Sequence, residues 1–104
     1  MDAQMKKGLL DVCVLALLNR GDSYGYELIS KISTVIDVSE STLYPILKRL
    51  EGVGHLVTYS REYNGRLRRY YRITPEGKKR LKDFDEEWQE MQKINAFVHM
   101  EDKR

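Results

Sequence analysis

A regular apolar stripe in residues 41–56, STLYPILKRLEGVGHL, constrains the fold more than any other feature of the chain. Its large apolar residues recur at the spacing of one helix face: Leu43, Ile46, Leu47, Leu50 and Val53. This spacing predicts an amphipathic helix that turns one face to a core. Proline lacks an N–H and is tolerated best in the first turn of a helix, so Pro45 limits where this helix can begin. We expect it to start near Ser41, with the hydroxyl of Ser39 or Ser41 as its N-cap.

The opposite face of this helix carries hydroxyl groups and cations, with no acid among them: Ser41, Thr42, Tyr44, Lys48 and Arg49. A helix that buries one face and offers donors and cations on the other fits the major groove of DNA. An ordinary amphipathic helix with a solvated basic face explains the same pattern. The rest of the chain has to distinguish these two interpretations.

Length and composition exclude several classes of protein. The chain has 104 residues, 41% of them hydrophobic and 33% charged, which predicts one globular domain and excludes a disordered chain. No apolar run approaches the about 20 residues of a membrane span, and the N-terminus lacks the order of a signal peptide. Cys13 is the only cysteine, so neither an internal disulfide nor a cysteine zinc cluster can form. We therefore expect a cytoplasmic protein without metal, cofactor or membrane contact.

The net charge of +2 hides a segregation along the chain. Residues 38–73 carry seven Lys or Arg and three Asp or Glu, a net charge of +4. The flanking segments 1–37 and 74–104 each have a net charge of −1. Positive charge concentrated in the middle third indicates a polyanionic partner more clearly than the small total does.

Two further helices are expected before residue 41. Residues 9–18 are apolar at almost every position, which predicts a helix buried on nearly all sides. In so small a domain, a partner subunit is the simplest cover for its second side. Residues 24–36 predict another helix, in which Gly25 either permits close helix approach or marks a frayed start. Helix, short turn and a second helix with a basic face is the order of a helix-turn-helix.

The segment after residue 56 predicts a β-hairpin. Val57–Tyr63 and Arg66–Ile73 are rich in strand-forming residues, and Asn64-Gly65 between them is a strong signal for a two-residue turn. That turn would set Arg61 opposite Arg68, a repulsive pair that indicates a nearby anion; a longer loop would shift this register. Arginine suits forked phosphate contacts and the minor groove, and the candidates are Arg61, Arg66, Arg68 and Arg69. A hairpin that its charges merely keep solvated is the alternative.

A last helix is expected to begin at Pro75, with Thr74 as its cap. Within it, mostly apolar residues alternate at spacings of three and four, as in a coiled-coil seam: Leu81, Phe84, Trp88, Met91, Asn95 and Val98. Asn95 is the polar member, of the kind that fixes register and partner number. We expect this helix to project and to pair with a second copy, although folding back on its own domain is the alternative. The predicted units are therefore residues 1–74 and 75–104.

The sequence resembles the PadR family of bacterial transcriptional regulators over most of its length. The resemblance lies in Tyr24–Leu28 (YGYEL), Ser41–Glu51 (STLYPILKRLE), Gly54 and Arg69–Gly77 (RYYRITPEG). The family often has glycine where Ser41 stands, which leaves the helix start open. The resemblance implies a mainly α (α+β) fold, a winged helix-turn-helix with a long C-terminal dimerisation helix. It further implies a repressor that effectors release.

The single C-terminal helix is similar to that of the family's small subclass, in which similar members bind planar aromatic compounds between their subunits. This points to Trp88, with Phe84 and Met91 beside it, as an effector site. Simple packing of Trp88 in the dimer interface is the alternative.

The predicted partner is double-stranded DNA, read by a homodimer as an inverted-repeat operator. An enzyme is not expected, because His55 and His99 are far apart and the sequence has no Gly-rich phosphate loop or metal-spaced cluster. Since a fold does not decide a function, a winged-helix protein-interaction module without DNA binding is the alternative. Such a module would have little use for a basic hairpin.

Overall fold

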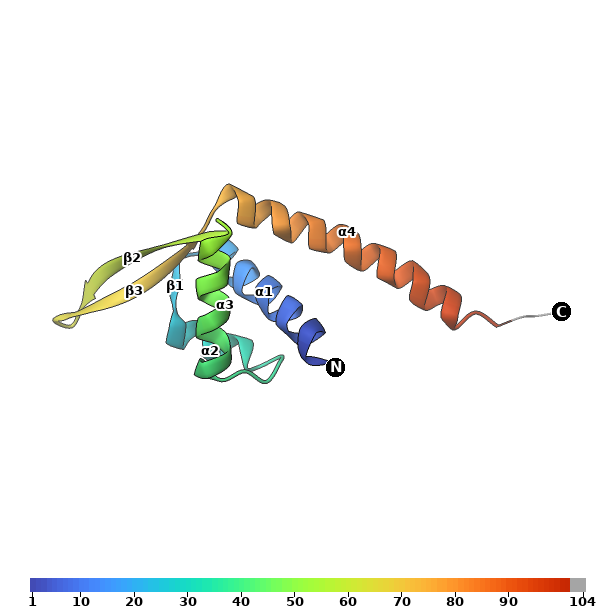
Figure 1. Ribbon diagram of the computed structural model, residues 1–104, viewed down its shortest axis with the longest axis horizontal. Coiled ribbons are helices and arrows are strands. Elements are labelled where there is room, and N and C mark those ends of the chain that lie inside the picture. Colours follow the sequence, from blue (N-terminus) through green and yellow to red (C-terminus); the bar gives the residue numbers. More distant parts are fainter. Residues whose placement is uncertain (102–104) are drawn as a thin grey trace.

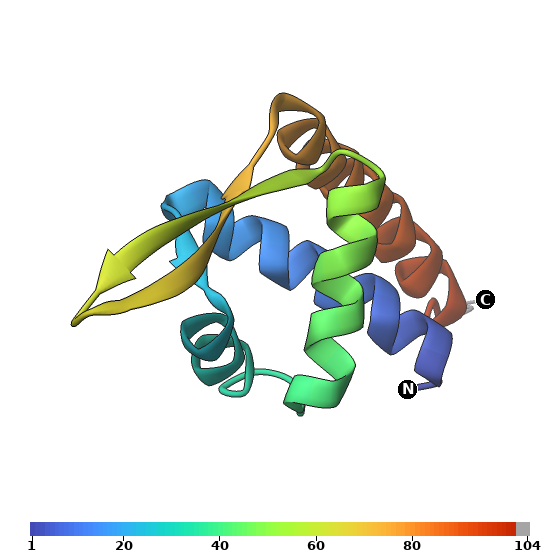
Figure 2. The same ribbon diagram turned by 60° about the vertical axis from the view of Figure 1, so that its left-hand side comes forward.

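The computed structural model describes residues 1–101, which form four helices and a small antiparallel sheet (Figure 1). The elements in chain order are α1 (Ala3–Arg20), β1 (Ser23–Tyr24), α2 (Gly25–Ile32), α3 (Glu40–Gly52), β2 (Leu56–Tyr63), β3 (Arg66–Ile73) and α4 (Pro75–Val98). Helices α1, α2 and α3 pack into one unit, from which the β2–β3 hairpin extends on one side and α4 on the other (Figures 1 and 2). This architecture confirms the expected winged helix-turn-helix. No helix within residues 1–101 combines the length and the apolar character needed to cross a bilayer.

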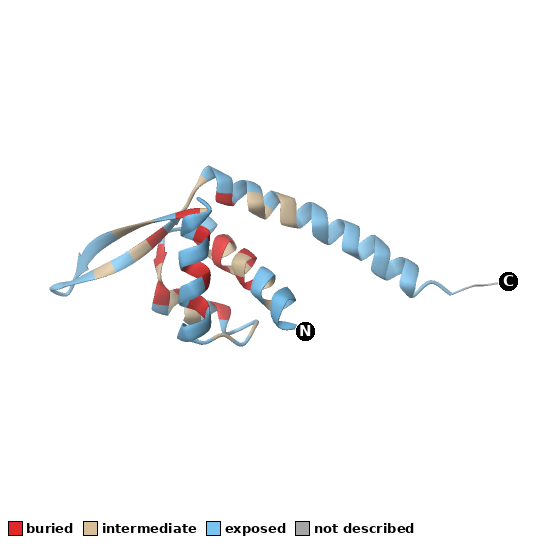
Figure 3. Ribbon diagram, in the orientation of Figure 1, coloured by how far each residue is buried: buried red, intermediate tan, exposed pale blue. Residues whose placement is uncertain are grey.

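The core lies where α1, α2 and α3 face one another and where the sheet meets them (Figure 3). Its buried members are Leu10, Val14, Leu15, Leu18, Leu28, Ile32, Leu43, Ile46, Leu47, Leu50, Leu56 and Tyr71. Four of the five predicted stripe residues of α3 are among them. Val53 was predicted wrongly: α3 ends at Gly52, so Val53 forms the C-cap and is 57% exposed.

The start of α3 differs from the prediction by one residue. The helix begins at Glu40 with Ser39 as N-cap, but the Ser39 side chain makes no capping hydrogen bond to the backbone. Its hydroxyl lies 3.0 Å from that of Ser41 and 3.2 Å from that of Thr42. Pro45 consequently lies inside the helix rather than in its first turn, and the carbonyl of Ser41 has no N–H at Pro45 to accept from.

The second helix is shorter than the predicted 24–36. Tyr24 belongs to strand β1, which the sequence did not indicate, and α2 ends at Ile32. The Thr34 hydroxyl donates to the Lys31 carbonyl at 2.7 Å, a local bond of the kind that competes with helix continuation. Ile36 still packs against the core, from the turn that follows the helix.

The hairpin has the predicted turn and register. Asn64 and Gly65 have φ angles of 51° and 78°, the left-handed conformations that a two-residue turn of this kind requires. Arg61 therefore pairs with Arg68, and Tyr59 pairs with Tyr70. Strand β1 adds to the other edge of β3, giving the sheet order β1-β3-β2.

Helix α4 is attached firmly at its start and projects beyond it. The Thr74 side chain accepts from the N–H of Gly77, and Pro75 occupies the first turn, as predicted. Gly77 is buried so closely against the carbonyl oxygen of His55 that a Cβ would overlap it. Leu81 packs against the core, whereas the helix from residue 85 onward is exposed in this single chain (Figure 3).

Candidate nucleic-acid interface

The predicted interface contains cations that form no ion pair with a carboxylate of residues 1–101. The five ion pairs among the described residues are Lys31–Glu27, Arg49–Asp11, Arg72–Asp22, Lys79–Asp83 and Arg80–Glu87, and Arg49 is the one predicted contact residue among them. The cations that remain without an acidic partner in this part of the chain include Lys48, Arg61, Arg66, Arg68 and Arg69. Their charges are available to an anion from outside.

Arg49 differs from the other predicted contact residues. Its guanidinium donates to the carboxylate of Asp11 on α1, and this hydrogen bond raises the pKa of Arg49. Arg49 therefore connects α3 to α1 within the chain. We leave it out of the set of residues proposed to contact DNA.

Helix α3 and strand β3 face each other across a shallow hollow of about 330 Å³. Tyr44, Lys48 and Glu51 line it from α3, and Arg69 and Tyr71 line it from β3. The carboxylate of Glu51 accepts from the Thr58 hydroxyl at 2.9 Å. Burial raises the pKa of the Tyr71 hydroxyl, which keeps it neutral. The structure thus brings together predicted contact residues from the helix and from the hairpin. Ser41 and Thr42 are exposed in the first turn of the same helix.

Tyr44 also explains why residue 25 is glycine. A Cβ at Gly25 would overlap the Tyr44 hydroxyl and would lie 2.9 Å from two of its ring carbons. The close helix approach is therefore the correct alternative of the two considered for Gly25. The Tyr44 ring thus packs directly on the backbone of α2 at Gly25, while 44% of Tyr44 remains exposed.

A hydrogen-bonded cluster at the base of the hairpin was not predicted. Asp22, in the turn after α1, accepts from Tyr59 Oη at 2.6 Å and from Arg72 Nε and Nη2 at 3.0 and 2.8 Å. The hydrogen bonds from Arg72 and then Tyr59 lower the pKa of Asp22, and the bond to Asp22 raises that of Tyr59. In the sequence, Asp22 stands in a Gly-Asp-Ser turn between two helices, and nothing there points to strand partners 37 and 50 residues away.

Tyrosine side chains continue this connection across the sheet. The Tyr59 and Tyr70 rings stack with centroids 5.6 Å apart, and Tyr24 meets Tyr70 edge to face at 5.8 Å. Such pairs stabilise a fold by about 0.5–1.5 kcal/mol beyond their burial. The hairpin therefore contacts β1 and the turn at the end of α1, in addition to the pairing between its own two strands.

The predicted seam residues lie along one face of α4. Phe84 and Trp88 stack with ring centroids 6.4 Å apart, and Met91 follows on the same side, half exposed like Trp88. Ile94, which was not predicted, extends this apolar face and is 62% exposed. The two carboxylates next to Trp88 are engaged within the helix. Glu87 pairs with Arg80 at 3.4 Å, and Asp85 accepts from the Gln89 amide at 3.3 Å.

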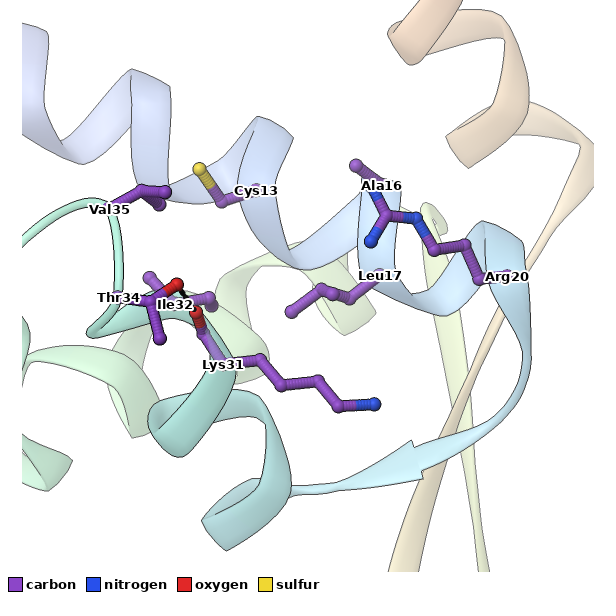
Figure 4. A pocket seen from close by; sticks show the side chains of 8 residues that line it. All are labelled: Cys13, Ala16, Leu17, Arg20, Lys31, Ile32, Thr34 and Val35. Carbon is purple, nitrogen blue, oxygen red and sulfur yellow. Dashed lines mark hydrogen bonds between the residues drawn. The ribbon is translucent and has the colours of Figure 1, made fainter.

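A second hollow, of about 350 Å³, lies between α1 and the end of α2 (Figure 4). Cys13 and Leu17 of α1 and Val35 after α2 form its apolar wall, and Arg20 and Lys31 stand at one end. Burial raises the pKa of the Cys13 thiol, which favours its protonated form. None of the residues described here gather into a cluster of His, Cys, Asp and Glu that could hold a metal ion.

The three-helix unit, the hairpin and the C-terminal helix define a winged helix-turn-helix protein. Residues 14–83 match the PadR-like family of transcriptional regulators. A transcriptional regulator from Clostridium thermocellum has a similar structure, with a TM-score of 0.84 and 36% identity over 96% of this chain and 99% of its own. The structure of a PadR-like transcriptional regulator from Bacillus cereus has a TM-score of 0.82. It is 31% identical in sequence and covers 95% of this chain and 100% of its own. An uncharacterized protein of Lysinibacillus sphaericus is 37% identical over 85% of each chain. The chain belongs to the PadR-like family, whose members are regulators and not enzymes.

The hydrogen-bonded cluster of Asp22, Tyr59 and Arg72, here called the Asp22 cluster, leads to a prediction about how stability depends on pH. Because the pKa of Asp22 is below its ordinary value of about 3.9, the cluster stabilises the fold at neutral pH. Its contribution is lost as the pH falls through the lowered pKa. Asp22→Asn is therefore expected to reduce the melting temperature at pH 7, with a gap to wild type that is constant down to about pH 5 and narrows below about pH 4.

Thermal denaturation followed by circular dichroism at a series of pH values measures this gap. Asp83→Asn is the matched control, because the half-buried Asp83 pairs with the exposed Lys79 one turn away in the same helix and is expected to shift the melting temperature less. A gap for Asp22→Asn that is as large at pH 3 as at pH 7 would contradict the assignment.

Proposed function

We propose that the chain is a sequence-specific DNA-binding repressor that acts in the cytoplasm as a homodimer and is released by a small-molecule effector. The observation that carries DNA binding is the set of cations without acidic partners that α3 and the hairpin offer side by side. Membership of a family of transcriptional regulators supports it.

In this proposal α3 enters the major groove and the hairpin contacts the backbone or the minor groove. Helix α3 has 13 residues and is therefore about 20 Å long, and the groove is about 12 Å wide. The helix face with Ser41, Thr42, Tyr44 and Lys48 would meet base edges and phosphates. The hairpin residues proposed to bind are Arg61, Arg66, Arg68 and Arg69. A two-fold dimer would read half-sites about one or two helical turns apart.

Lys48→Ala is expected to weaken binding to a duplex that the wild-type protein selects from a random library. Removing one phosphate contact lowers the slope of log K against log salt concentration by about one unit. Lys93→Ala is the matched control, because Lys93 lies on the face of α4 opposite the apolar one. Fluorescence anisotropy over a salt series measures both variants. If the wild-type protein selects no duplex from the library and its affinity for DNA does not change with salt concentration, the protein-interaction module is favoured instead.

The homodimer is proposed to form through α4, with α1 contributing. Support comes from the apolar face of α4, where Phe84, Trp88, Met91 and Ile94 follow one another and residues 1–101 leave about half or more of each of the last three exposed. Burying one such side chain contributes about 1.5–3 kcal/mol, so a handful from each subunit is enough to hold a dimer. The half-buried wall of α1 at Cys13 offers a second apolar surface.

Met91→Lys is expected to dissociate the dimer, because it sets a charge in the middle of the apolar seam. Gln89→Lys introduces the same side chain on another face of α4 and should leave the dimer intact. Sedimentation velocity at micromolar concentration distinguishes the two. A Met91→Lys protein that still sediments as a folded dimer would rule out this seam.

The effector site is proposed to lie at the same seam, around Trp88. Support comes from its exposed ring, which stacks on Phe84 next to the flexible side chain of Met91. A two-fold axis there would bring both copies of Trp88 together around a flat molecule. Glu87 is paired with Arg80, whereas the Gln89 amide carries no charge to balance Asp85, so the rings suit a flat ligand that is neutral or cationic. Packing of Trp88 in the interface is the competing role.

Trp88 is the only tryptophan, so its fluorescence reports on this site alone. Flat aromatic cations and neutral phenolics are expected to quench it and to weaken DNA binding. For the ligand to release the protein from DNA, it must bind more tightly to the dimer conformation that cannot bind DNA than to the conformation that can. In Trp88→Ala the same compounds should no longer release DNA. Unchanged emission across both groups of compounds would remove the support for this site.

A further inference from the structure

Arg68 lies between two tyrosine rings that come from different parts of the fold. Its guanidinium carbon is 4.0 Å from the ring centroid of Tyr24 and 3.9 Å from that of Tyr63. Both distances are well inside the about 6 Å limit of a cation–π contact. Tyr24 belongs to β1, directly before α2, whereas Tyr63 ends β2 at the tip of the hairpin. We call these three residues the arginine clamp.

The clamp leaves one part of Arg68 open. A cation–π contact uses the charge of the guanidinium and does not require its five N–H donors. Within residues 1–101 Arg68 has neither an ion pair nor a hydrogen bond to a side chain, although it is half-buried and the other hairpin arginines proposed to bind DNA are exposed. A partly desolvated cation with free donors is suited to an anion that arrives from outside.

Arg68 lies where the two parts of the proposed interface meet, the helix α3 and the hairpin. Arg68 borders a hollow of about 350 Å³ at the hairpin tip, together with Asn64 and Arg66. It also borders one of about 310 Å³ near the start of α2, which Tyr44 of α3 lines as well. An anion held by Arg68 would therefore lie between the helix and the hairpin tip.

We propose that the arginine clamp is a preorganised site for one DNA backbone phosphate, which Arg68 binds with two parallel N–H donors. This inference rests on the proposed DNA-binding function. Tyr24 and Tyr63 act as positioning residues, because they hold the guanidinium plane and connect the hairpin tip to the start of α2. Since the side chain is already ordered, little rotamer entropy is lost when the phosphate binds.

Substitution of Arg68 by lysine distinguishes the contribution of the planar guanidinium from that of the positive charge. Lysine keeps the positive charge but has a compact ammonium group on a flexible stem, without a planar edge. We expect Arg68→Lys to bind the selected duplex about tenfold more weakly, the loss typical of a charge-assisted contact, with an unchanged salt slope. Arg61→Lys, at the exposed position paired with Arg68, should weaken binding less. A hairpin that had merely lost its structure would instead lower the slope by several units.

Substitution of Tyr63 tests the positioning role. Tyr63→Leu removes the ring and is expected to weaken binding as Arg68→Lys does, whereas Tyr63→Phe keeps the ring and should retain most of the affinity. If Arg68→Lys and Tyr63→Leu bind DNA like wild type, or no more weakly than Arg61→Lys, the arginine clamp is not a phosphate site. The proposed DNA-binding function is then still supported if Lys48→Ala weakens binding. If Arg68→Ala and Lys48→Ala both bind like wild type, the proposed DNA interface itself fails.

Discussion

The burial of one face of α3 is the interaction on which the rest of the structure depends. Leu43, Ile46, Leu47 and Leu50 are almost fully inaccessible between α1, α2 and the sheet. Because all four lie on one side of the helix, the opposite side must face outward. That constraint, not any polar contact, decides where Lys48 is presented. The ion pair of Arg49 with Asp11 then connects the edge of the same helix to α1.

The hairpin contacts other parts of the fold besides its own two strands. An isolated two-stranded hairpin is marginally stable at best. Here β1 supplies a third strand, Asp22 binds Tyr59 and Arg72 at the base, and the Tyr24, Tyr70 and Tyr59 rings pack in sequence across the sheet. A hairpin held in this way presents its arginines at a defined distance from α3, which is what simultaneous contact with a groove and the adjacent backbone requires.

Helix α4 is connected to the same unit by short, specific contacts. The N–H of Thr74 donates to the carbonyl of His55 at 3.1 Å, and Gly77 packs against that carbonyl without space for a side chain. The beginning of α4 is thus held at the junction of α3 and β2. If two copies pair through α4, a ligand that changes the angle between the two helices also changes the separation of the two α3 helices. This provides a physical route from the proposed effector site to DNA.

The sequence by itself determined the elements whose cause is local. The apolar stripe of α3, the register that Asn64-Gly65 imposes on the hairpin and the Thr74-Pro75 start of α4 each follow from residues a few positions apart, and the structure confirms them. Only the tertiary structure decided the contacts between distant segments: strand β1, the pairing of Arg49 with Asp11, the Asp22 cluster and the position of Arg68 between Tyr24 and Tyr63. Periodicity and turn chemistry report on neighbours in the chain. They carry no information about which side chains meet across 38 or 50 residues, because the packing of the core sets those distances.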